Sequence, residues 1–505
     1  MGKIESLQPK TSRSADLFRA EYGHFIGGEW VGGDSGEKIA LLNPATGEVL
    51  AHIASGNAAD ATRAVDAAHG AFPDWRNRSP SERQAILYEM ARRLRARVAD
   101  YAMLETLNNG KPLMEAMHFD LPMAIEQFEM FAGTPWQVHG ESTSRPNAIG
   151  IIHREPLGVC AQIIPWNVPL IMMAAKIAPA LATGNTVVLK PSEIVCLSVL
   201  EFFREMADLI PAGVVNVVTG YGPKVGEALV THPKVRKVAF TGSRPTAQKL
   251  IQYASVNIIP QTMELGGKSA NIVCEDADLD AAAEGAAMSV VLNKGEVCLA
   301  GSRVFVHEKV RDAFLEKFQG NLRRIRIGDP TDAATQLGAQ ASKMQLDKIL
   351  GYLELGPKEG AKVLMGGKQA HVKGLERGYF IEPTIFVDVD NRMRIAQEEI
   401  FGPVSTVISW KDEADLVRMA NDSQYGLGGG LWTRNLARAH RIARALETGT
   451  IWVNRYYNFI GGMPIGGYKQ SGFGREFAHE VLNHYTQTKS VIINLDDGVL
   501  GVFSR

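Results

Sequence analysis

Residues 158–193 read GVCAQIIPWNVPLIMMAAKIAPALATGNTVVLKPSE, and their pattern indicates the fold of the chain. A short apolar run at 159–164 is followed by a helical pattern at 170–181 and a β-branched run at 186–189. Apolar runs of this length are typical of strands that are buried on both faces. A strand, a helix and a second strand joined by short connections predict a parallel sheet covered by helices.

The same alternation continues to Glu264. Further strands are expected at 214–218, 235–240 and 258–263, with helices at 197–209, 224–230 and 246–254. In such a sheet, nucleotides bind at the carboxyl ends of the strands. A second α/β block begins near Ala270, with helices expected at 278–292, 310–324 and 436–445 and strands at 404–409 and 450–453. The polar, glycine-rich stretch 360–378 is predicted to be a surface excursion.

The length and composition indicate a soluble protein with more than one domain. The chain has 505 residues, 45% of them apolar and 22% charged, which is ordinary for globular proteins but long for one core. A net charge of −1 provides no field that would attract nucleic acid or an anionic membrane. No apolar run is long enough to span a bilayer, and the amino terminus lacks the apolar core of a secretory signal. The start, MGKIES, also fits the loose pattern for N-myristoylation, which remains a minor alternative.

The cysteines and histidines argue against a disulfide scaffold and a metal site. The four cysteines form no Cys-x-x-Cys pair, and the 12 histidines form no ligand cluster. We therefore expect a reducing, cytoplasmic location, with one cysteine functional.

That cysteine is Cys298, which lies in the glycine-flanked loop NKGEVCLAGSR at 293–303. Upstream, Glu264 begins the glycine-rich stretch ELGGK. A cysteine can bond covalently to a carbonyl carbon, and a nearby base can then activate water to release the product. The plainer interpretation is a small buried cysteine and a surface glutamate. A boundary between the two blocks near Gly266 would place both side chains at the interface, where ligand sites often form.

Several turns at predicted strand ends fit a dinucleotide. The segment GYGPKVG at 220–226 misses the Gly-x-Gly-x-x-Gly spacing by one residue and is weak evidence. The segment FTGS at 240–243 precedes a helix whose amino terminus, with the Ser243 hydroxyl, would receive a pyrophosphate. At 190–193, Lys190 and Glu193 would bind ribose hydroxyls, and the carboxylate would repel a 2′-phosphate, which favours NAD over NADP. A solvated turn is the plainer interpretation of this tetrapeptide.

Asn167 lies between two prolines in PWNVP, so its backbone is stiff. A fixed amide donor, together with a backbone N–H of the nucleophile's loop, is what an oxyanion requires. An asparagine that satisfies a turn is the alternative interpretation.

Together these motifs resemble those of the NAD(P)-dependent aldehyde dehydrogenase superfamily. The resemblance runs from NPATGE at 43–48 to YKQSG at 468–472, and includes EEIFGP at 398–403 and PIGG at 464–467. It implies an α/β fold with a Rossmann-type coenzyme domain, an α/β catalytic domain and a small β oligomerisation arm. We place the coenzyme domain at 21–137 and 158–266, the catalytic domain at 267–476, the arm and C-terminal tail at 138–157 and 477–505, and a flexible leader at 1–20.

The resemblance also implies the chemistry. The Cys298 thiolate would attack the aldehyde, and the thiohemiacetal would pass hydride to NAD⁺. Water activated at Glu264 would then hydrolyse the thioester, with Asn167 holding the oxyanion. Lys176 and Glu476 resemble members of a proton path behind Glu264. The coenzyme residues implied are Ile164, Pro165, Trp166, Lys190, Ser192, Glu193, Gly222, Gly226, Phe240, Thr241, Gly242, Ser243, Leu265, Gly266, Glu399 and Phe401.

The substrate residues implied are Val168, Met172, Val297, Leu299, Arg455, Phe459 and Ile465. Several are smaller than is common in the family, which predicts a bulky or extended apolar aldehyde rather than betaine aldehyde or acetaldehyde. Tyr456 and Tyr457 would restore aromatic contact, and Arg455 would instead receive the carboxylate of a semialdehyde or tie down its own loop.

Three further roles are compatible with the same fold. A CoA-acylating enzyme would not need Glu264, a non-catalytic protein would not need Cys298, and an esterase would not need the coenzyme motifs. Glu296 stands where glutamine is frequent, and we expect its side chain to point away from Cys298 and serve the loop.

The apolar run VIINL at 491–495 predicts a strand near the chain end. Exposed, it would be an aggregation liability, so we expect it to pair with another subunit in a dimer or tetramer. Packing on the same chain is the alternative.

Overall fold

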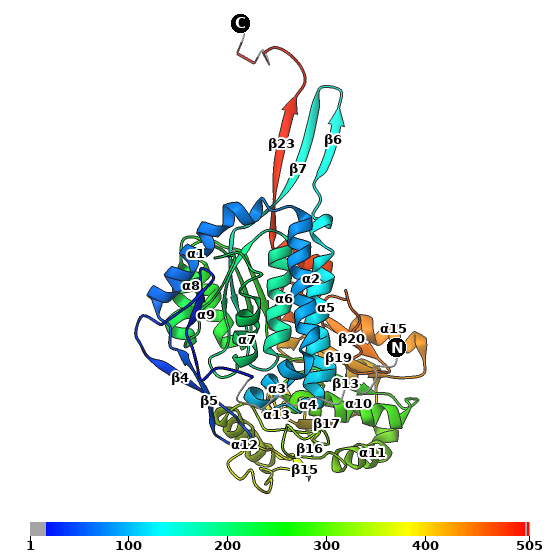
Figure 1. Ribbon diagram of the computed structural model, residues 1–505. Helices are drawn as coiled ribbons and strands as arrows, with labels where there is room; N and C mark the ends of the chain where they lie inside the picture. Colours follow the sequence, from blue (N-terminus) through cyan, green and yellow to red (C-terminus); the bar gives the residue numbers. More distant parts are fainter. Residues whose placement is uncertain (1–16, 500–501, 504–505) are drawn as a thin grey trace.

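The computed structural model describes residues 17–499 and 502–503. Most of the expected leader and the whole myristoylation pattern lie outside the described residues. Two large sheets and a projecting arm organise the rest of the chain (Figure 1).

The first sheet has eight strands in the order β22-β12-β11-β8-β9-β10-β2-β3. The strands are β2 His24–Ile26, β3 Glu29–Val31, β8 Val159–Ile163, β9 Thr186–Lys190, β10 Val215–Val217, β11 Val235–Thr241, β12 Gln261–Glu264 and β22 Gly472–Phe473. The five from β8 to β12 are mutually parallel, which confirms the predicted parallel α/β sheet. Strand β22 comes from far along the chain and pairs antiparallel with β12, with Glu264 opposite Gly472.

Helices cover both faces of this sheet, because alternate strand residues point to opposite sides. In β8, Val159 and Ile163 pack in a core with α1, α8 and α9, whereas Cys160 packs in another core with α2, α5, α6 and α7. The helices are α1 Ala58–Arg76, α2 Pro80–Ala96, α3 Val98–Asn109, α4 Leu113–Glu115, α5 Leu121–Ala132, α6 Pro169–Ala182, α7 Leu197–Met206, α8 Glu227–Thr231 and α9 Arg244–Ala254. Part of the helix predicted at 224–230 is instead a short π-helix, Gly222–Gly226.

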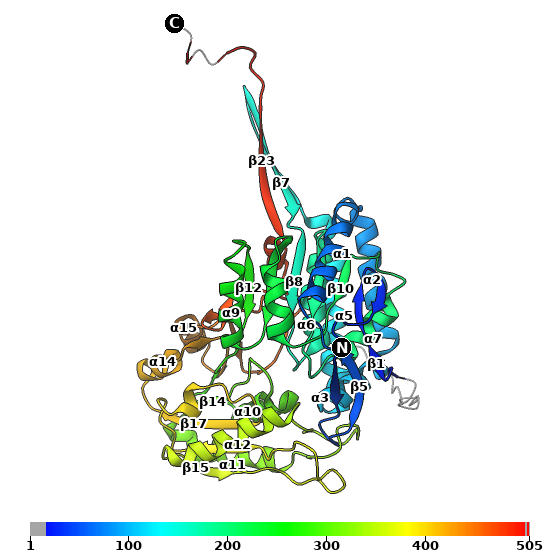
Figure 2. The ribbon, with the colours of Figure 1, turned by 90° about the vertical axis from the view of Figure 1, so that its left-hand side faces the viewer.

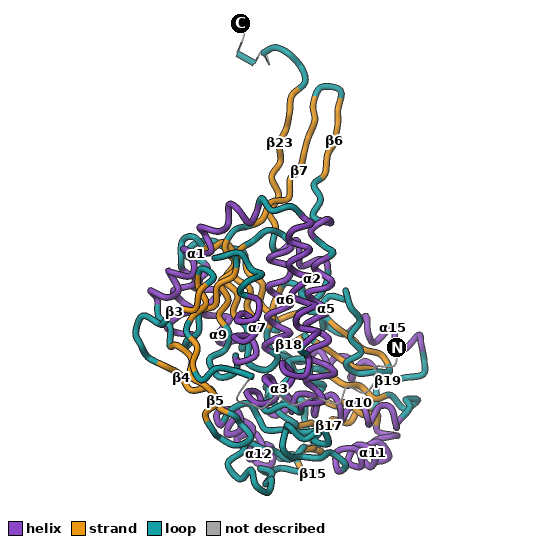
Figure 3. The backbone as a smooth tube through the Cα atoms, in the orientation of Figure 1, coloured by secondary structure: helices purple, strands orange, loops and turns teal. Residues whose placement is uncertain are grey.

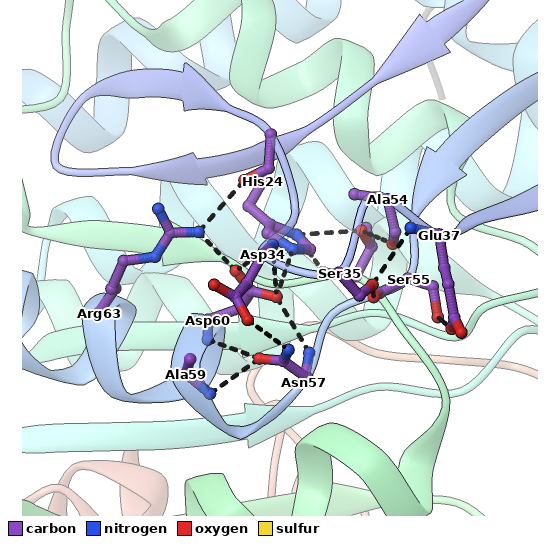
Figure 4. A network of polar contacts seen from close by, with 12 residues as sticks. His24, Asp34, Ser35, Glu37, Ala54, Ser55, Asn57, Ala59, Asp60 and Arg63 are labelled. Atoms are coloured by element: carbon purple, nitrogen blue, oxygen red, sulfur yellow. Dashed lines mark hydrogen bonds and ion pairs between the residues drawn. The ribbon is translucent and has the colours of Figure 1, made fainter.

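A buried polar network fastens the N-terminal segment to this domain (Figure 4). Asn57 caps α1 by accepting hydrogen bonds from the Ala59 and Asp60 amides, and the Asp60 carboxylate accepts one from the Asn57 amide at 3.0 Å. Asp60 also lies 3.4 Å from Nε2 of buried His24, whose Nδ1 faces the Thr219 amide at 3.3 Å. The network thereby anchors the loop that leads from β10 to Gly222.

The second sheet has seven strands in the order β15-β16-β17-β14-β13-β19-β20. The strands are β13 Ala270–Val273, β14 Arg303–His307, β15 Lys362–Met365, β16 Thr384–Val387, β17 Val404–Trp410, β19 Gly428–Trp432 and β20 Thr450–Val453. The helices are α10 Leu279–Val291, α11 Arg311–Arg323, α12 Lys343–Lys358, α13 Arg394–Gln397, α14 Glu413–Asn421 and α15 Leu436–Ala445. The prediction of a surface excursion at 360–378 was wrong in part. This stretch contains the edge strand β15, whose mostly exposed residues carry no buried-strand pattern.

The arm rises from the first sheet as three antiparallel strands in the order β23-β7-β6 (Figures 1 and 2). The strands are β6 Glu141–Arg145, β7 Ala148–Pro156 and β23 Thr486–Asn494. Strand β23 pairs along its whole length with β7 of the same chain, so one edge of β23 is covered within the chain. Ile492 is nevertheless 79% exposed and Ile493 41% exposed.

There are also two smaller sheets, of which Figure 3 labels β4, β5 and β18. The first has the order β1-β5-β4, with β1 Glu21–Tyr22, β4 Lys38–Leu42 and β5 Val49–Ala54. The second pairs β18 Tyr425–Gly426 with β21 Tyr468–Lys469.

Candidate active site

The carboxyl ends of four neighbouring strands gather the predicted coenzyme residues. Strands β12, β11, β8 and β9 are adjacent and parallel, so the segments that follow them share one edge of the sheet. The Gly242 amide donates to the Glu264 carbonyl at 3.0 Å, and the Ile164 amide donates to the Lys190 carbonyl at 3.1 Å. These segments are Ile164–Trp166, Lys190–Glu193, Phe240–Ser243 and Leu265–Gly266.

Several polar groups at this edge suit a dinucleotide. The buried Lys190 ammonium lies 3.3 Å from the Glu193 carboxylate, which is 29% exposed and open to solvent. Ser243 shares a hydrogen bond of 2.9 Å with Thr246 at the amino end of α9. The Thr241 hydroxyl is buried and has no hydrogen-bond partner within the described chain. A ribose diol and a pyrophosphate would supply the missing partners of such groups.

The remaining coenzyme residues lie in two places. Ser192 accepts a hydrogen bond from the Ile194 amide at 3.4 Å. Gly222 and Gly226 lie in the short π-helix after β10, and a Cβ atom at either would meet no atom within 4 Å. This segment therefore leaves open space around both glycines, although it lacks the expected glycine spacing.

Glu399 and Phe401 approach the same edge from the second sheet. The Phe401 ring lies 5.3 Å from the Trp166 ring at nearly a right angle. The Glu399 carboxylate accepts a hydrogen bond from the Gly267 amide at 2.9 Å, and burial raises its pKa. A Cβ atom on Gly266 would lie 2.4 Å from this carboxylate, so only glycine permits the approach.

The Cys298 loop begins with three residues whose backbone lies in the left-handed region. Asn293, Lys294 and Gly295 have φ values of 46°, 60° and 74°. Such a backbone costs a non-glycine residue about 1–2 kcal/mol. A Cβ atom on Gly295 would lie 2.2 Å from the Gly402 carbonyl, so the bend allows the loop to pack against the segment that follows Phe401.

Cys298 is half-buried at the meeting point of these segments. Burial, followed by the nearby charges of Glu399 and Glu264, raises the pKa of its thiol to about 12. A Cβ atom on Gly267 would lie 2.4 Å from the Cys298 carbonyl oxygen. Without a nearby positive charge, the thiol is therefore protonated at neutral pH.

Glu264 ends β12 and is also buried. Its burial, followed by the charge of Glu476, raises its pKa well above the usual range. One oxygen of its carboxyl group has no hydrogen-bond partner within the described chain. Behind it, Lys176 of α6 and Glu476 form a buried ion pair. The charges of both members of this pair act on Glu264.

Asn167 connects with the Cys298 loop. Its side-chain nitrogen donates to the Glu296 carbonyl at 2.9 Å, and its own carbonyl accepts from the Asn293 side chain at 2.8 Å. The Glu296 carboxylate lies 3.0 Å from the Lys294 ammonium and accepts a hydrogen bond from the Ala341 amide at 3.0 Å. Glu296 thus contacts its own loop and its neighbours, as its sequence position led us to expect.

Most of the predicted substrate residues lie together. Val297, Leu299, Phe459 and Ile465 pack in one core cluster with Cys298, and Ile465 also packs against the core that contains Val168 and Met172. Phe459 and Ile465 line a cavity of about 140 Å³, together with Met123, Trp452 and Phe477. Met172 lies within α6 and Val168 directly precedes it, and Ile465 contacts both their core and that of Val297. Leu299 is buried and would lie 2.7 Å from a Cβ atom on Gly428.

Arg455 lies elsewhere, at a larger cavity of about 540 Å³ that is also lined by Glu284, Met288 and Arg324. Neither Phe459 nor Ile465 lines that cavity. The structure therefore does not bring Arg455 together with these two substrate residues.

An aromatic cluster beside the smaller cavity was not fully predicted. The Phe459 ring lies 5.7 Å from Phe119, 5.4 Å from Trp452 and 5.9 Å from Tyr457. Tyr456 joins the cluster, with its ring 4.8 Å from that of Tyr457. No local pattern marks Phe119 or Trp452, because the fold brings these rings together from distant parts of the chain.

Metal-ligand clusters and membrane-spanning helices are both absent from residues 17–499 and 502–503. No group of three or more His, Cys, Asp or Glu side chains there is arranged to hold a metal ion. Among the helices of the same residues, none combines the length and apolar character needed to cross a membrane.

The chain matches known proteins over nearly its whole length. The model of the aldehyde dehydrogenase family matches residues 30–491. The chain is 45% identical over 502 residues to an aldehyde dehydrogenase of Deinococcus radiodurans, covering 98% of this chain and 97% of the relative. It is 45% identical over 494 residues to acetaldehyde dehydrogenase 2 of Cupriavidus necator, covering 96% and 97%. A solved indole-3-acetaldehyde dehydrogenase of P. syringae, in complex with NAD⁺ and IAA, is 41% identical with a TM-score of 0.93, covering 96% of this chain and 100% of that one.

Proposed function

Because the chain belongs to the aldehyde dehydrogenase family, we propose that it oxidises an aldehyde to the carboxylic acid with NAD as coenzyme. The observation that carries the proposal is that a half-buried thiol, a buried carboxyl group whose charge acts on it and a side-chain amide bonded to its loop lie together. NAD is further supported by the polar groups at the sheet edge and by the NAD⁺ bound in the P. syringae relative.

In the proposed reaction, Cys298 is the nucleophile. The positive charge of bound NAD⁺ would favour release of the thiol proton to solvent. The thiolate then attacks the aldehyde carbon, and the resulting oxyanion accepts hydrogen bonds from the Asn167 side chain and the Cys298 amide. NAD⁺, when bound beside Glu399 and Phe401, would supply the acceptor for the hydride of this carbon. The product of that step is a thioester on Cys298.

Glu264 serves the second half of the reaction. Its carboxylate takes a proton from the water that attacks the thioester, and the acid product leaves the Cys298 thiolate. The raised pKa of Glu264 suits a group that must accept this proton near neutral pH. The Lys176–Glu476 pair then provides a route by which the proton leaves Glu264.

For the substrate, we propose an apolar aldehyde, bulky or extended as the small side chains Val168 and Ile465 suggest. The aromatic rings of Phe459 and Trp452 line the cavity, and Phe119 packs against Phe459. A short aldehyde is the second candidate, which the cavity volume of about 140 Å³ and the name of the C. necator relative favour. A carboxylated aldehyde has less support, because Arg455 lines a different cavity.

The test is the appearance of NADH across a panel of aldehydes. The panel runs from short aliphatic to branched, aromatic and ω-carboxylated aldehydes, with NAD and NADP in parallel and Cys298→Ala as the control. Turnover that depends on Cys298 and NAD supports the proposal, and the best substrate decides between the two candidates. If the protein binds NAD but oxidises no aldehyde of the panel, a CoA-dependent or non-catalytic role would be favoured.

We also infer that the arm mediates self-association, in a dimer or a tetramer. Strand β23 exposes Ile492 and Ile493 although it pairs with β7, and a second copy would cover these side chains. Light scattering of the wild type and of Ile492→Lys tests this inference. A wild-type protein that is monomeric at micromolar concentration would contradict it.

A further inference from the structure

The loop that precedes the proposed nucleophile contains a buried ion pair. The Lys294 ammonium is 3.0 Å from the Glu296 carboxylate, and both side chains are fully buried. Burial lowers the pKa of Lys294 and raises that of Glu296. A buried pair adds little net stability compared with apolar residues of the same size, so its presence calls for a reason beyond stability.

Lys294 reaches back into the first domain. Its ammonium donates to the Asn109 carbonyl at 3.1 Å and also to the Asn109 side-chain oxygen. The Asn109 side-chain nitrogen in turn donates to the Trp166 carbonyl at 2.9 Å and contacts the Asn167 carbonyl at 3.4 Å. The Asn109 side chain therefore connects Lys294 to the backbone of Asn167, the proposed oxyanion donor.

Glu296 also contacts Asn167, through the Asn167 side chain. Its carbonyl accepts the hydrogen bond from the Asn167 side chain at 2.9 Å, and its carboxylate holds the Ala341 amide at 3.0 Å. The contacts form a closed circuit through Glu296, Lys294, Asn109 and Asn167. Both the backbone and the side chain of Asn167 are thus tied to one ion pair.

The backbone conformation of Lys294 makes these contacts depend on the ion pair. Lys294 is held in the left-handed region, which a lysine rarely adopts, between Asn293 and Gly295 in the same region. Such a conformation persists only when surrounding contacts over-determine it. The Lys294 side chain contributes to holding this conformation through the contacts of its ammonium with Asn109 and Glu296.

We propose that Lys294 and Glu296 are positioning residues, which hold the Asn167 amide at a fixed place relative to the Cys298 amide. The inference rests on the proposed function, because it assigns a purpose to the geometry of Asn167 and Cys298. Neither residue touches the reacting atoms. Their effect on the reaction is transmitted through Asn109, the Glu296 carbonyl and the loop backbone.

The experiment is a double-mutant cycle with Lys294→Met, Glu296→Gln and the double variant. For each full-length protein, kcat and KM are measured with the best aldehyde at saturating NAD. The rate constant for alkylation of Cys298 by iodoacetamide and the thermal unfolding midpoint are measured in parallel. Lys343→Met is the matched control, because Lys343 forms an exposed pair with Asp347 on the surface of α12.

We expect Lys294→Met to lower kcat about 10- to 100-fold, because small displacements of catalytic groups have effects of this size. KM should stay within about twofold, since the substrate walls are unchanged. Glu296→Gln keeps an oxygen for the Ala341 amide and should have a smaller effect. The double variant should be more active than Lys294→Met alone, because it does not leave the Glu296 carboxylate buried without its partner. The control should resemble the wild type.

The proposal is overturned if kcat of Lys294→Met stays within about twofold of the wild type while only the unfolding midpoint falls. It is also overturned if the two single effects simply multiply in the double variant, because residues in one network do not act independently. If Lys294→Met does not fold, the isosteric Glu296→Gln decides the question by the same kcat and KM comparison.

Failure of the proposed function has a different signature. A wild type without Cys298-dependent turnover would refute the proposed function, and the alkylation rates would still report whether the pair orders the loop. An active wild type whose variants show no coupling would refute the positioning role alone.

Discussion

The side-chain nitrogen of Asn167 donates a hydrogen bond of 2.9 Å to the backbone oxygen of Glu296, two residues before Cys298. Asn167 follows a strand of the first sheet, whereas Cys298 precedes a strand of the second. This contact therefore links the two halves of the molecule at the proposed site of chemistry.

Asn167→Ala should lower kcat by about 10²–10³-fold, because one preorganised oxyanion donor has an effect of that size. The affinity for NAD should change little, since the change removes no group at the ribose end. Steady-state kinetics measure both values. Asn77→Ala, which removes an exposed amide at the end of α1, is the control and should retain full activity. Rates of Asn167→Ala close to the wild type would remove Asn167 from the mechanism.

Without coenzyme, alkylation of Cys298 by iodoacetamide should be slow at pH 7 and should accelerate as the pH rises towards 10. The reason is that the thiol has a pKa of about 12, and only the thiolate reacts. NAD⁺ should accelerate the reaction at pH 7, because its positive charge favours the thiolate. Mass spectrometry measures the labelling.

The other three cysteines are buried, so the label should be confined to Cys298 and absent from Cys298→Ala. A rate that does not depend on pH or NAD⁺ would contradict the expected environment of the thiol.

Glu264→Gln should release about one equivalent of NADH per site and then stop. The first half of the reaction does not need the base, but hydrolysis of the thioester does. Stopped-flow absorbance at the NADH band resolves the burst. Continued turnover at the wild-type rate would show that another group activates the water.

The acid limb of the hydrolysis rate should move to higher pH in Lys176→Met. Burial and Glu476 raise the pKa of Glu264, whereas the charge of Lys176 opposes that rise. Without Lys176, the Glu264 carboxyl group should therefore keep its proton to a higher pH, and hydrolysis should begin later as the pH rises. An unchanged acid limb in the pH–rate profile would show that Lys176 does not influence the protonation of Glu264.

Gly267→Ala should lower activity more than tenfold, because the new Cβ atom would meet the Cys298 carbonyl oxygen at 2.4 Å. Gly320→Ala in α11 is the matched control, since its Cβ atom would meet no atom within 4 Å. That control should keep full activity and gain roughly 0.5–1 kcal/mol of stability, as alanine replaces glycine within a helix. Equal activity of the two variants would contradict the close approach.

Glu193→Gln should weaken the preference for NAD over NADP. The carboxylate at the end of β9 would repel a 2′-phosphate, and glutamine removes that charge while keeping a hydrogen-bonding group. The ratio of kcat/KM for NAD and NADP measures the change. A ratio that does not move would assign the discrimination to other residues.

Much of the fold was predictable from local sequence patterns. The predicted strand at 450–453 and helix at 436–445 coincide with β20 and α15. Edge strand β15 escaped prediction because its residues are mostly exposed. The π-helix at Gly222–Gly226 escaped because helical periodicity does not distinguish it from an α-helix.

The sequence by itself determined the alternation of strands and helices from 158 to 264 and the turns at the strand ends, because these depend on the periodicity and composition of short segments. It also marked Cys298, Glu264 and Asn167, each within its own motif. Only the tertiary structure decided which groups meet: Lys294 reaches Asn109, Phe119 reaches Phe459, and β22 pairs with β12. These contacts join segments far apart in the chain, and no local pattern encodes them, because they form only when the two sheets and their loops pack together.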